Sequence, residues 1–196
     1  MTIPKTPRRG KKPVKRAPSK KKPAPSLVAA NLWKPATKGA EELGVLELPS
    51  GTVSVCDAGT LLRPVHVKLP AGKYQARVVF DGVHDNLSMA LVKKGATPIA
   101  WKNVGSYGVD AGMAGFFDGK LYKKLDKHQF PDDGNMYDSL IANHLDPAET
   151  KGHAGAFVPF LDSKFCACRS GQGDGVYATF VGKDKNGIVV AVVTTF

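Results

Sequence analysis

The sequence predicts a mostly β domain, an antiparallel sandwich or partly closed barrel with a short helical insertion, preceded by a disordered basic arm. Three observations lead to this prediction. Short apolar or alternating runs recur from residue 44 onward, separated by clusters of Pro, Gly, Asp and Ser. A helical spacing of apolar residues occurs only near residues 119–145. Basic residues and prolines dominate the start of the chain, as is typical of a segment that cannot bury a core.

Residues 1–38 are the predicted arm and linker, and residues 39–196 the β-rich domain. Twelve of the 28 Lys and Arg residues and none of the 17 acids lie in residues 1–38, so this part carries +12 and the remainder −1. Such an arm can bind DNA or RNA non-specifically by neutralising phosphates, whereas a solubilising tail explains the same composition almost as well. The predicted nucleic-acid-binding residues are Lys5, Arg8, Arg9, Lys11, Lys12, Lys15, Arg16, Lys20, Lys21 and Lys22.

The predicted strands begin after Gly44. Turn-forming groups such as Pro49-Ser50-Gly51 and Pro70-Ala71-Gly72 separate them, which favours a meander over βαβ units. Residues 27–33 can form a short docking helix or an extended segment, and residues 40–43 a single helical turn. Strands are expected at 45–48, 52–56, 65–69, 74–80, 88–93, 98–101, 104–117 with internal turns, 156–160, 164–168, 177–181 and 188–194, the last two forming a hairpin.

The helical insertion follows the strand near residue 117. Charged residues around Leu121 and Leu125 predict a first helix over about 119–127. Asp132 or Asp133 can cap a second helix. Its predicted buried stripe, spaced i, i+4, i+5 and i+8, consists of Met136, Leu140, Ile141 and His144.

Three glycines alternate with polar residues in the block Ser170-Gly171-Gln172-Gly173-Asp174-Gly175-Val176-Tyr177, directly before a strand. This pattern predicts a sharp polar turn, because glycine adopts conformations that a Cβ disfavours. The block resembles the uncharacterised bacterial family known as domain of unknown function 4241, over about residues 44–196. That resemblance implies a bacterial source and a domain boundary, but no chemistry. Further blocks that carry it are Leu48-Pro49-Ser50-Gly51-Thr52-Val53, Cys56-Asp57, Leu69-Pro70-Ala71-Gly72-Lys73-Tyr74, Gly108-Val109-Asp110-Ala111-Gly112 and Phe117-Asp118.

The same glycine block is the predicted ligand or partner loop. Ser170 lacks the Gly-x-Ser-x-Gly context and the following helix of a hydrolase nucleophile, so a turn role is expected for its hydroxyl. A phosphate-binding loop is disfavoured because Lys-Ser or Lys-Thr is missing. The predicted loop residues are Ser170, Gly171, Gly173, Asp174, Gly175 and Tyr177.

Four aspartates are the predicted metal ligands. Asp57, Asp110, Asp118 and Asp174 each follow a strand or lie in a glycine-flanked turn. If the fold brings them together, their carboxylates can bind Mg²⁺, Mn²⁺ or Ca²⁺ and activate a water for hydrolysis. The alternative, favoured here, is that each aspartate accepts hydrogen bonds from its own turn.

Sparse cysteines indicate a reduced, cytoplasmic setting. Cys56, Cys166 and Cys168 lack the Cys-x-x-Cys spacing of zinc sites, so we expect small buried hydrophobic residues rather than ligands. The longest apolar run, Ile188 to Val193, is far shorter than the roughly 20 residues that span a bilayer, so no membrane association is expected.

The function predicted from these patterns is that of a non-enzymatic binding protein. Its arm would associate with nucleic acid or another polyanion, and its β domain would recognise an unknown partner. No cofactor is predicted, although a divalent cation fits the aspartates. Two alternatives stay open: a divalent-metal-dependent hydrolase, and a small immunity or interaction protein that blocks a partner enzyme.

Overall fold

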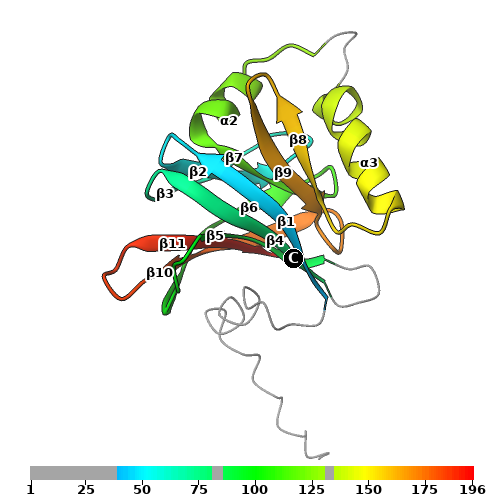
Figure 1. The fold of residues 1–196 in the computed structure, drawn as a ribbon. Helices are drawn as coiled ribbons and strands as arrows, with labels where there is room; N and C mark the ends of the chain where they lie inside the picture. The colour runs from blue at the N-terminus through cyan, green and yellow to red at the C-terminus, as the bar shows by residue number, and fades with distance from the viewer. Residues whose placement is uncertain (1–38, 81–85, 131–134) are drawn as a thin grey trace, which may run out of the picture.

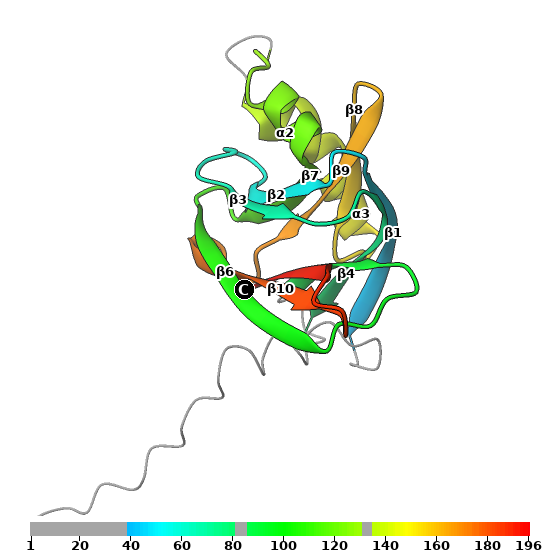
Figure 2. The ribbon, with the colours of Figure 1, turned by 90° about the vertical axis from the view of Figure 1, so that its left-hand side faces the viewer.

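The described part of the chain folds into three layers, two antiparallel sheets and a helical layer (Figures 1 and 2). A computed structural model describes residues 39–80, 86–130 and 135–196. The predicted basic arm and the candidate caps Asp132 and Asp133 therefore lie outside the described residues.

Both sheets are built from short, antiparallel strands. Sheet A has the strand order β1-β4-β5-β11-β10-β6, and sheet B the order β3-β2-β7-β9-β8. Sheet A consists of β1 (Ala40–Leu48), β4 (Gly72–Phe80), β5 (Asn86–Lys93), β6 (Ala100–Val109), β10 (Gly175–Lys183) and β11 (Val189–Thr195). Sheet B consists of β2 (Thr52–Asp57), β3 (Val65–Lys68), β7 (Met113–Asp118), β8 (Ala156–Phe160) and β9 (Ser163–Arg169).

The first hydrophobic core lies between the two sheets. Because successive side chains of a strand point to opposite faces, every second residue of each strand enters this layer. Its fully buried members include Leu46, Tyr74, Leu91, Phe116 and Val192, which come from five different strands. Burying one such side chain contributes roughly 1.5–3 kcal/mol, so this layer is a main source of the stability of the sandwich.

The second core lies between sheet B and the helical segments. Figure 1 shows α2 (Gly119–Leu125) and α3 (Ala142–Thr150) on the side of sheet B that faces away from sheet A, and α3 continues a π-helix, η2 (Tyr137–Ile141). Leu125 and Ile141 are buried here beside Phe117 and Phe165, whose rings stack with centroids 4.5 Å apart. No helix in the described ranges is long and apolar enough to cross a membrane.

The mostly β prediction is confirmed, and the two sheets form a sandwich rather than a closed barrel. β6 lies beside β3 at one corner of the molecule without pairing to it (Figure 2). The predicted terminal hairpin is also confirmed, since β10 and β11 pair antiparallel. The first predicted helix is confirmed as α2, which begins at Gly119 and ends two residues earlier than expected.

The predicted buried stripe of the second helix is wrong in its spacing. Met136, Ile141 and Leu145 are buried, whereas Leu140 and His144 are only partly buried. The cause is η2, in which each turn contains about one residue more than an α-helical turn. The buried side chains are therefore five and then four residues apart.

Two strand predictions need correction. Residues 40–43 do not form a helical turn but begin β1, which pairs with β4 from Ala40 onward. A register shift between Glu42 and Gly44, where Gly44 has a φ of +122°, breaks the alternation that would have indicated a strand. The separate strands expected at 98–101 and from 104 are one strand, β6, whose register also shifts where it pairs with β10.

Candidate functional site

The glycine block forms a tight turn that its own hydroxyl groups close. The Ser170 Oγ and the Tyr177 hydroxyl both donate hydrogen bonds to the Gly173 carbonyl oxygen, at 2.6 and 2.7 Å. Ser170 is fully buried and Tyr177 nearly so. Because both hydroxyl groups are engaged with the backbone, they stabilise the turn.

Gly171 brings the turn against a second polar junction. It has a φ of +63°, and a Cβ at this position would overlap the carbonyl oxygen of Asn86. The Asn86 side-chain amide donates to the carbonyl oxygens of Ala154 and Arg169, at 3.1 and 2.9 Å. The block therefore connects the start of β5 and the end of β9 to the loop before β8.

The predicted loop residues thus divide into two groups. Ser170, Gly171 and Tyr177 belong to the junction, whereas Asp174 lies exposed on the outside with its neighbours Gln172 and Val176. Val176 is 76% exposed, the largest value among the exposed large hydrophobic residues described. A partner would meet these exposed side chains rather than Ser170 or Tyr177.

Asp57 joins two loops of neighbouring strands. Its buried carboxylate accepts four backbone N–H groups: Oδ1 those of Gly59 and Thr60 at 2.7 and 3.2 Å, and Oδ2 those of Asp110 and Ala111 at 2.6 and 2.7 Å. Both oxygens are fully used by the backbone. The favoured alternative, in which the aspartate accepts from its own turn, is confirmed for this residue and extends to a second loop.

Asp118 has a comparable role at the start of α2. Its Oδ1 accepts the N–H of Lys120 at 2.9 Å as the N-cap of the helix, and its Oδ2 accepts the N–H of Ser50 at 2.9 Å. Asp118 is 2% exposed. Its carboxylate fixes the end of β7 to the β1–β2 turn.

The remaining two predicted metal ligands, Asp110 and Asp174, are exposed. They lie at the same end of the β6–β10 pair, since Val109 pairs with Gly175. Across the described residues, no group of three or more His, Cys, Asp or Glu side chains is arranged to hold a metal ion. The structure therefore brings Asp57, Asp110 and Asp174 to neighbouring loops, whereas Asp118 lies at the opposite end of the β2–β7 pair, and the four carboxylates do not form one site.

The three cysteines are buried, free thiols. Burial raises the pKa of the Cys166 thiol to about 12 and those of Cys56 and Cys168 well above their ordinary value. All three thiols stay protonated at neutral pH. The interpretation as small buried hydrophobic residues is confirmed.

The loops just described form one surface, which we call the junction surface: residues 57–60, 110–112 and 170–175. Asp57 ties the first loop to the second, and the Ser170 N–H donates to the Gly112 carbonyl oxygen at 3.0 Å, which ties the second to the third. These hydrogen bonds hold the backbone of the loops that carry Asp110 and Asp174 in place relative to the sheets.

Arg169 lies beside the junction surface in a cluster of polar side chains. Its Nε donates to both oxygens of Glu149 at 3.0 and 3.3 Å, and its Nη2 donates to Asp146 and the Tyr137 hydroxyl at 2.9 and 3.2 Å. Burial alone would lower the pKa of Arg169, but the hydrogen bonds to Tyr137 and Glu149 raise it above its ordinary value. Its charge thus fastens η2 and α3 to the end of β9.

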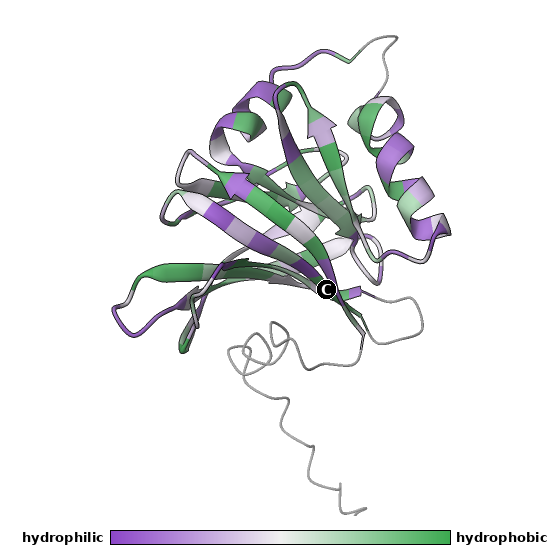
Figure 3. Cartoon of the chain, in the orientation of Figure 1, coloured by the Kyte–Doolittle hydropathy of each residue, from purple (hydrophilic) through white to green (hydrophobic). Residues whose placement is uncertain are grey.

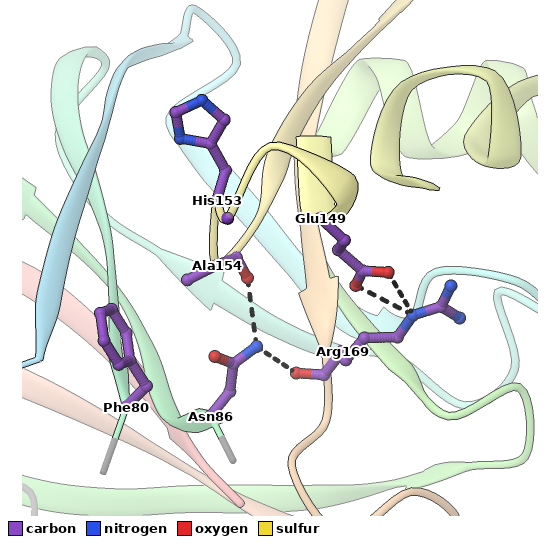
Figure 4. Close-up of a pocket in the computed structure, with 7 residues that line it drawn as sticks. Phe80, Asn86, Glu149, His153, Ala154 and Arg169 are labelled. Atoms are coloured by element: carbon purple, nitrogen blue, oxygen red, sulfur yellow. Dashed lines mark hydrogen bonds and ion pairs between the residues drawn. The ribbon is translucent and has the colours of Figure 1, made fainter. Parts of the chain in front are cut away.

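A cleft of about 480 Å³ lies next to this cluster (Figure 4). Its lining includes Phe80, Asn86, Glu149, His153 and Arg169. Figure 4 shows the Glu149 carboxylate turned toward Arg169, and the His153 ring turned away from them. The His153 Nδ1 lies 2.7 Å from an oxygen of Glu41, whose other oxygen accepts the Ala154 N–H at 2.6 Å.

Sequence reasoning missed this cluster. The available signal was the position of Arg169 directly before the glycine block. Glu149 and Asp146 belong to no recognisable motif. They lie far from Arg169 along the chain, and only the packing of the helical layer brings them into contact with it. Ordinary polar residues on a helix predict a solvent-facing surface, not an ion-paired junction.

Comparison with known proteins connects this arrangement to one family. Residues 86–194 match the model of a family described as protein of unknown function DUF4241. The match begins at Asn86, so the blocks at residues 48–53, 56–57 and 69–74 precede it. Searches of curated proteins and of solved structures found no match. Because the match covers more than half of its 196 residues, the chain belongs to the DUF4241 family.

Proposed function

We propose that this chain is a non-enzymatic binding protein, in which residues 1–26 associate with nucleic acid or another polyanion and the β domain recognises a protein partner through the junction surface. The observation that carries the proposal is the separation of charge. Residues 1–38 carry a formal net charge of +12 and residues 39–196 one of −1, because all 17 acidic residues follow residue 38. A basic segment attached to a nearly neutral domain supports electrostatic association through the segment alone.

The geometry of the junction surface supports the second half of the proposal. Its loops are held by backbone hydrogen bonds to Asp57 and Gly112, so little conformational entropy would be lost when a partner binds. Asp110 and Asp174 offer exposed carboxylates, and Val176 offers an exposed apolar side chain nearby. A partner with basic residues around a small apolar contact fits this surface.

The proposed association of residues 1–26 with nucleic acid is tested by measuring binding to a random DNA duplex at several salt concentrations. Each phosphate contact contributes about −0.9 to the slope of log K against log salt. Replacing Lys11, Lys12, Lys15 and Arg16 by Gln is expected to weaken binding and to make the slope shallower by up to about 3.6.

The matched control replaces four exposed lysines of the β domain by Gln: Lys68, Lys94, Lys102 and Lys127. It removes the same charge, and binding is expected to stay unchanged. If both variants weaken binding equally, only the net charge matters and no specific role belongs to the arm. If the unaltered chain does not bind, the arm reduces to a solubilising tail.

The metal-dependent hydrolase stays a rival prediction. It requires divalent ions to raise the melting temperature by mass action, and Asp174→Asn to remove that rise. The backbone contacts of Asp57 and Asp118 offer it no support, since those carboxylates already accept all the hydrogen bonds described above. An immunity or interaction protein differs from the proposal in requiring no binding of DNA by residues 1–26. Capture of one stoichiometric partner is expected in both cases, and Asp110→Lys together with Asp174→Lys is expected to abolish it.

A further inference from the structure

The loop between β2 and β3 holds an exposed leucine beside an exposed arginine. Leu61 and Arg63 have φ values of +55° and +45°, which are uncommon for residues with a Cβ and persist only where the surroundings hold them. Leu61 is buried, its N–H donates to the Asp57 carbonyl oxygen at 3.0 Å, and its own carbonyl oxygen accepts the Tyr122 hydroxyl at 2.9 Å. The loop is thus fixed at Leu61, while Leu62, which is 60% exposed, and Arg63 face solvent.

Leu62 and Arg63 lie at the same end of the molecule as the junction surface. Asp57 contacts both loops, since its carbonyl oxygen accepts the Leu61 N–H and its carboxylate accepts the Asp110 N–H at 2.6 Å. Arg63 follows Leu61 by two residues, which is at most about 7 Å of chain. Leu62 and Arg63 therefore extend the junction surface.

This end of the molecule also offers exposed apolar side chains. Val176 pairs with Gly108, two residues before Asp110, so Leu62 and Val176 lie on either side of the Asp110 loop. None of the exposed large hydrophobic residues in the described ranges lies on a helix. Figure 3 shows both hydrophilic and hydrophobic residues along α2 and α3, as expected for helices with one side on sheet B and the other in solvent. An apolar contact with a partner is therefore available at the junction end and not on the helical layer.

The same end carries exposed charges of both signs. Arg63, Asp110 and Asp174 are all exposed. None of the ion pairs found among the described residues includes any of these three. A surface with both charges and an apolar contact can be complementary to a copy of itself when a twofold axis relates the two copies.

We propose that two copies of this chain form a dimer with twofold symmetry through Leu62, Arg63, Asp110, Asp174 and Val176, which we call the dimer patch. Arg63 of each copy would contact Asp110 and Asp174 of the other, and Leu62 of each copy would contact Val176 of the other. The inference rests on the proposed binding role of the junction surface and identifies its protein partner as a second copy.

The residues of the chain itself favour this partner. A partner of Asp110, Asp174 and Val176 needs a basic residue beside a small apolar contact, and Arg63 beside Leu62 meets that need. The loops are already fixed by hydrogen bonds to Asp57, so association would cost little conformational entropy. Exposed ion pairs contribute little individually and the dimer patch is small, so the dimer is weak and reversible.

The net charge of the chain sets the conditions of the test. Each copy carries a formal charge of +11, which opposes the approach of a second copy. At a salt concentration of about 0.15 M the Debye length is about 8 Å, so repulsion between distant charges is largely screened, whereas charges in contact are screened less. Self-association is therefore measured on the full chain at this salt concentration.

The first test is sedimentation equilibrium over a wide range of protein concentration. The unaltered chain is expected to show a reversible equilibrium between monomer and dimer. Arg63→Glu is expected to weaken the dimer by more than about tenfold, because like charges then meet twice in each dimer. Glutamate also has a Cβ, so the change adds no new backbone strain at residue 63, and an unchanged melting temperature verifies the fold.

The matched control is Lys123→Glu on the exposed side of α2. It makes the same change of charge outside the dimer patch and is expected to leave the dimer unchanged. Equal weakening by Lys123→Glu and Arg63→Glu would mean that only the net charge matters, and would overturn the proposal.

The second test restores the contact with complementary charges. Asp110→Lys/Asp174→Lys is expected to be monomeric by itself, because Arg63 then faces lysines. Mixed in equal amounts with the Arg63→Glu chain, it is expected to form a mixed dimer in native mass spectrometry, since every ion pair of the dimer patch then joins opposite charges. The control mixture with the Lys123→Glu chain has the same net charges and is expected to form far fewer mixed dimers.

Three further outcomes would overturn the proposal: a monomer at every concentration, growth beyond the dimer, and a complementary mixture that stays monomeric. Growth beyond the dimer would indicate a head-to-tail contact without a twofold axis. The proposed function fails separately. A monomeric chain that still captures a different protein, and loses it on Asp110→Lys/Asp174→Lys, removes only the second copy as partner, whereas a monomer that captures none removes both.

Discussion

Asp57 shows how one buried carboxylate organises a surface that another molecule could bind. Its four N–H partners come from two loops, one of which is more than 50 residues away along the chain. Each oxygen accepts two donors, so neither is available to a metal ion without breaking backbone contacts. The residue supports a site through the loops rather than by contact with a ligand.

Replacing Asp57 by Asn is expected to destabilise the protein by about 2–4 kcal/mol. The amide keeps one accepting oxygen but turns an NH₂ group toward two backbone N–H donors, and each buried unsatisfied group costs about 1–3 kcal/mol. Urea unfolding measures the loss. Asp110→Asn, on an exposed side chain, is the control and should change stability by less than about 0.5 kcal/mol. Similar losses in both variants would refute the structural role of Asp57.

Gly171 and Gly173 provide a matched comparison. Both have positive φ, +63° and +83°, so alanine at either position adds roughly 1–2 kcal/mol of backbone strain. Only at Gly171 would the new Cβ also overlap the Asn86 carbonyl oxygen, since no atom lies within 4 Å at Gly173. Gly171→Ala is therefore expected to be clearly the more destabilising in denaturant titrations. The reverse order would exclude a close approach of the turn to Asn86.

Residue patterns predicted part of this arrangement. The Asp-x-Gly spacing at Asp57 indicates a turn closed by its own carboxylate, and this contact is present. Nothing in the sequence near Asp57 indicates the two N–H donors from residues 110 and 111, because only the pairing of β2 with β7 brings that loop close to Asp57. Local chemistry can be read from neighbouring residues, whereas contacts across strands require the topology.

At the scale of elements, two kinds of contact attach the helical layer to sheet B. Ile141 and Leu145 bury their side chains against sheet B, and Arg169 joins the end of β9 to Glu149 and Asp146. The guanidinium also lies 5.5 Å from the centroid of the Tyr137 ring. The ion-paired junction therefore fixes where α3 ends relative to the cleft.

Replacing Arg169 by Gln is expected to destabilise the protein by about 1–3 kcal/mol and to speed amide hydrogen exchange in α3. Charge-assisted hydrogen bonds contribute about 1.5–3 kcal/mol, reduced here because the side chain is 38% exposed. Lys124→Gln removes an ion pair with Asp162 whose side chains are 53% and 82% exposed, and should have almost no effect. Unchanged exchange in α3 after the Arg169 substitution would show that apolar packing alone attaches it.

The existence of the elements was largely predictable, but their internal irregularities were not. Glycine and proline clusters marked most of the strand ends. The π-helical turn at 137–141 left no signature in the sequence, because its wider spacing arises when Met136, Ile141 and Leu145 all reach the same sheet. The bulge in β1 similarly disguised a strand as one helical turn.

At the scale of the whole molecule, the buried thiols and phenols predict how stability responds to alkaline pH. Burial raises the pKa of Cys166 from 9.0 to about 12, and that of Tyr74 from 10.0 to about 12. Between pH 9 and 12 the folded chain keeps protons that the unfolded chain releases. Stability is therefore fully present below about pH 9 and is lost as the pH rises.

Cys166→Ala is expected to make this alkaline loss shallower. One fully titrating group contributes about 1.4 kcal/mol per pH unit, so the difference becomes measurable within one unit above pH 9. Urea unfolding at pH 8, 9 and 10 compares the variant with the unaltered chain. Parallel pH profiles would mean that the Cys166 thiol does not titrate differently in the two states.

The division of the chain into a basic part and a β domain was visible in the sequence because charge is a local property. The position of the cleft was not, since Phe80 and Asn86 meet Glu149 and Arg169, which lie more than 60 residues later in the chain, only in the folded structure. The family match shows to which family the chain belongs but assigns it no activity. The binding role therefore depends on the measurements proposed above.

The side-chain contacts of Asn86 have a consequence for the order of folding. Its two hydrogen bonds close loops of 68 and 83 residues, so they cannot form before β8 and β9 have docked near β5. Closing such loops has a large entropic cost, which places these bonds after the rate-limiting barrier. Asn86→Ala is accordingly expected to accelerate unfolding while leaving the refolding rate nearly unchanged in stopped-flow experiments. A slower refolding rate would instead place this junction in the folding nucleus, and the residue at which the family match begins would then direct folding.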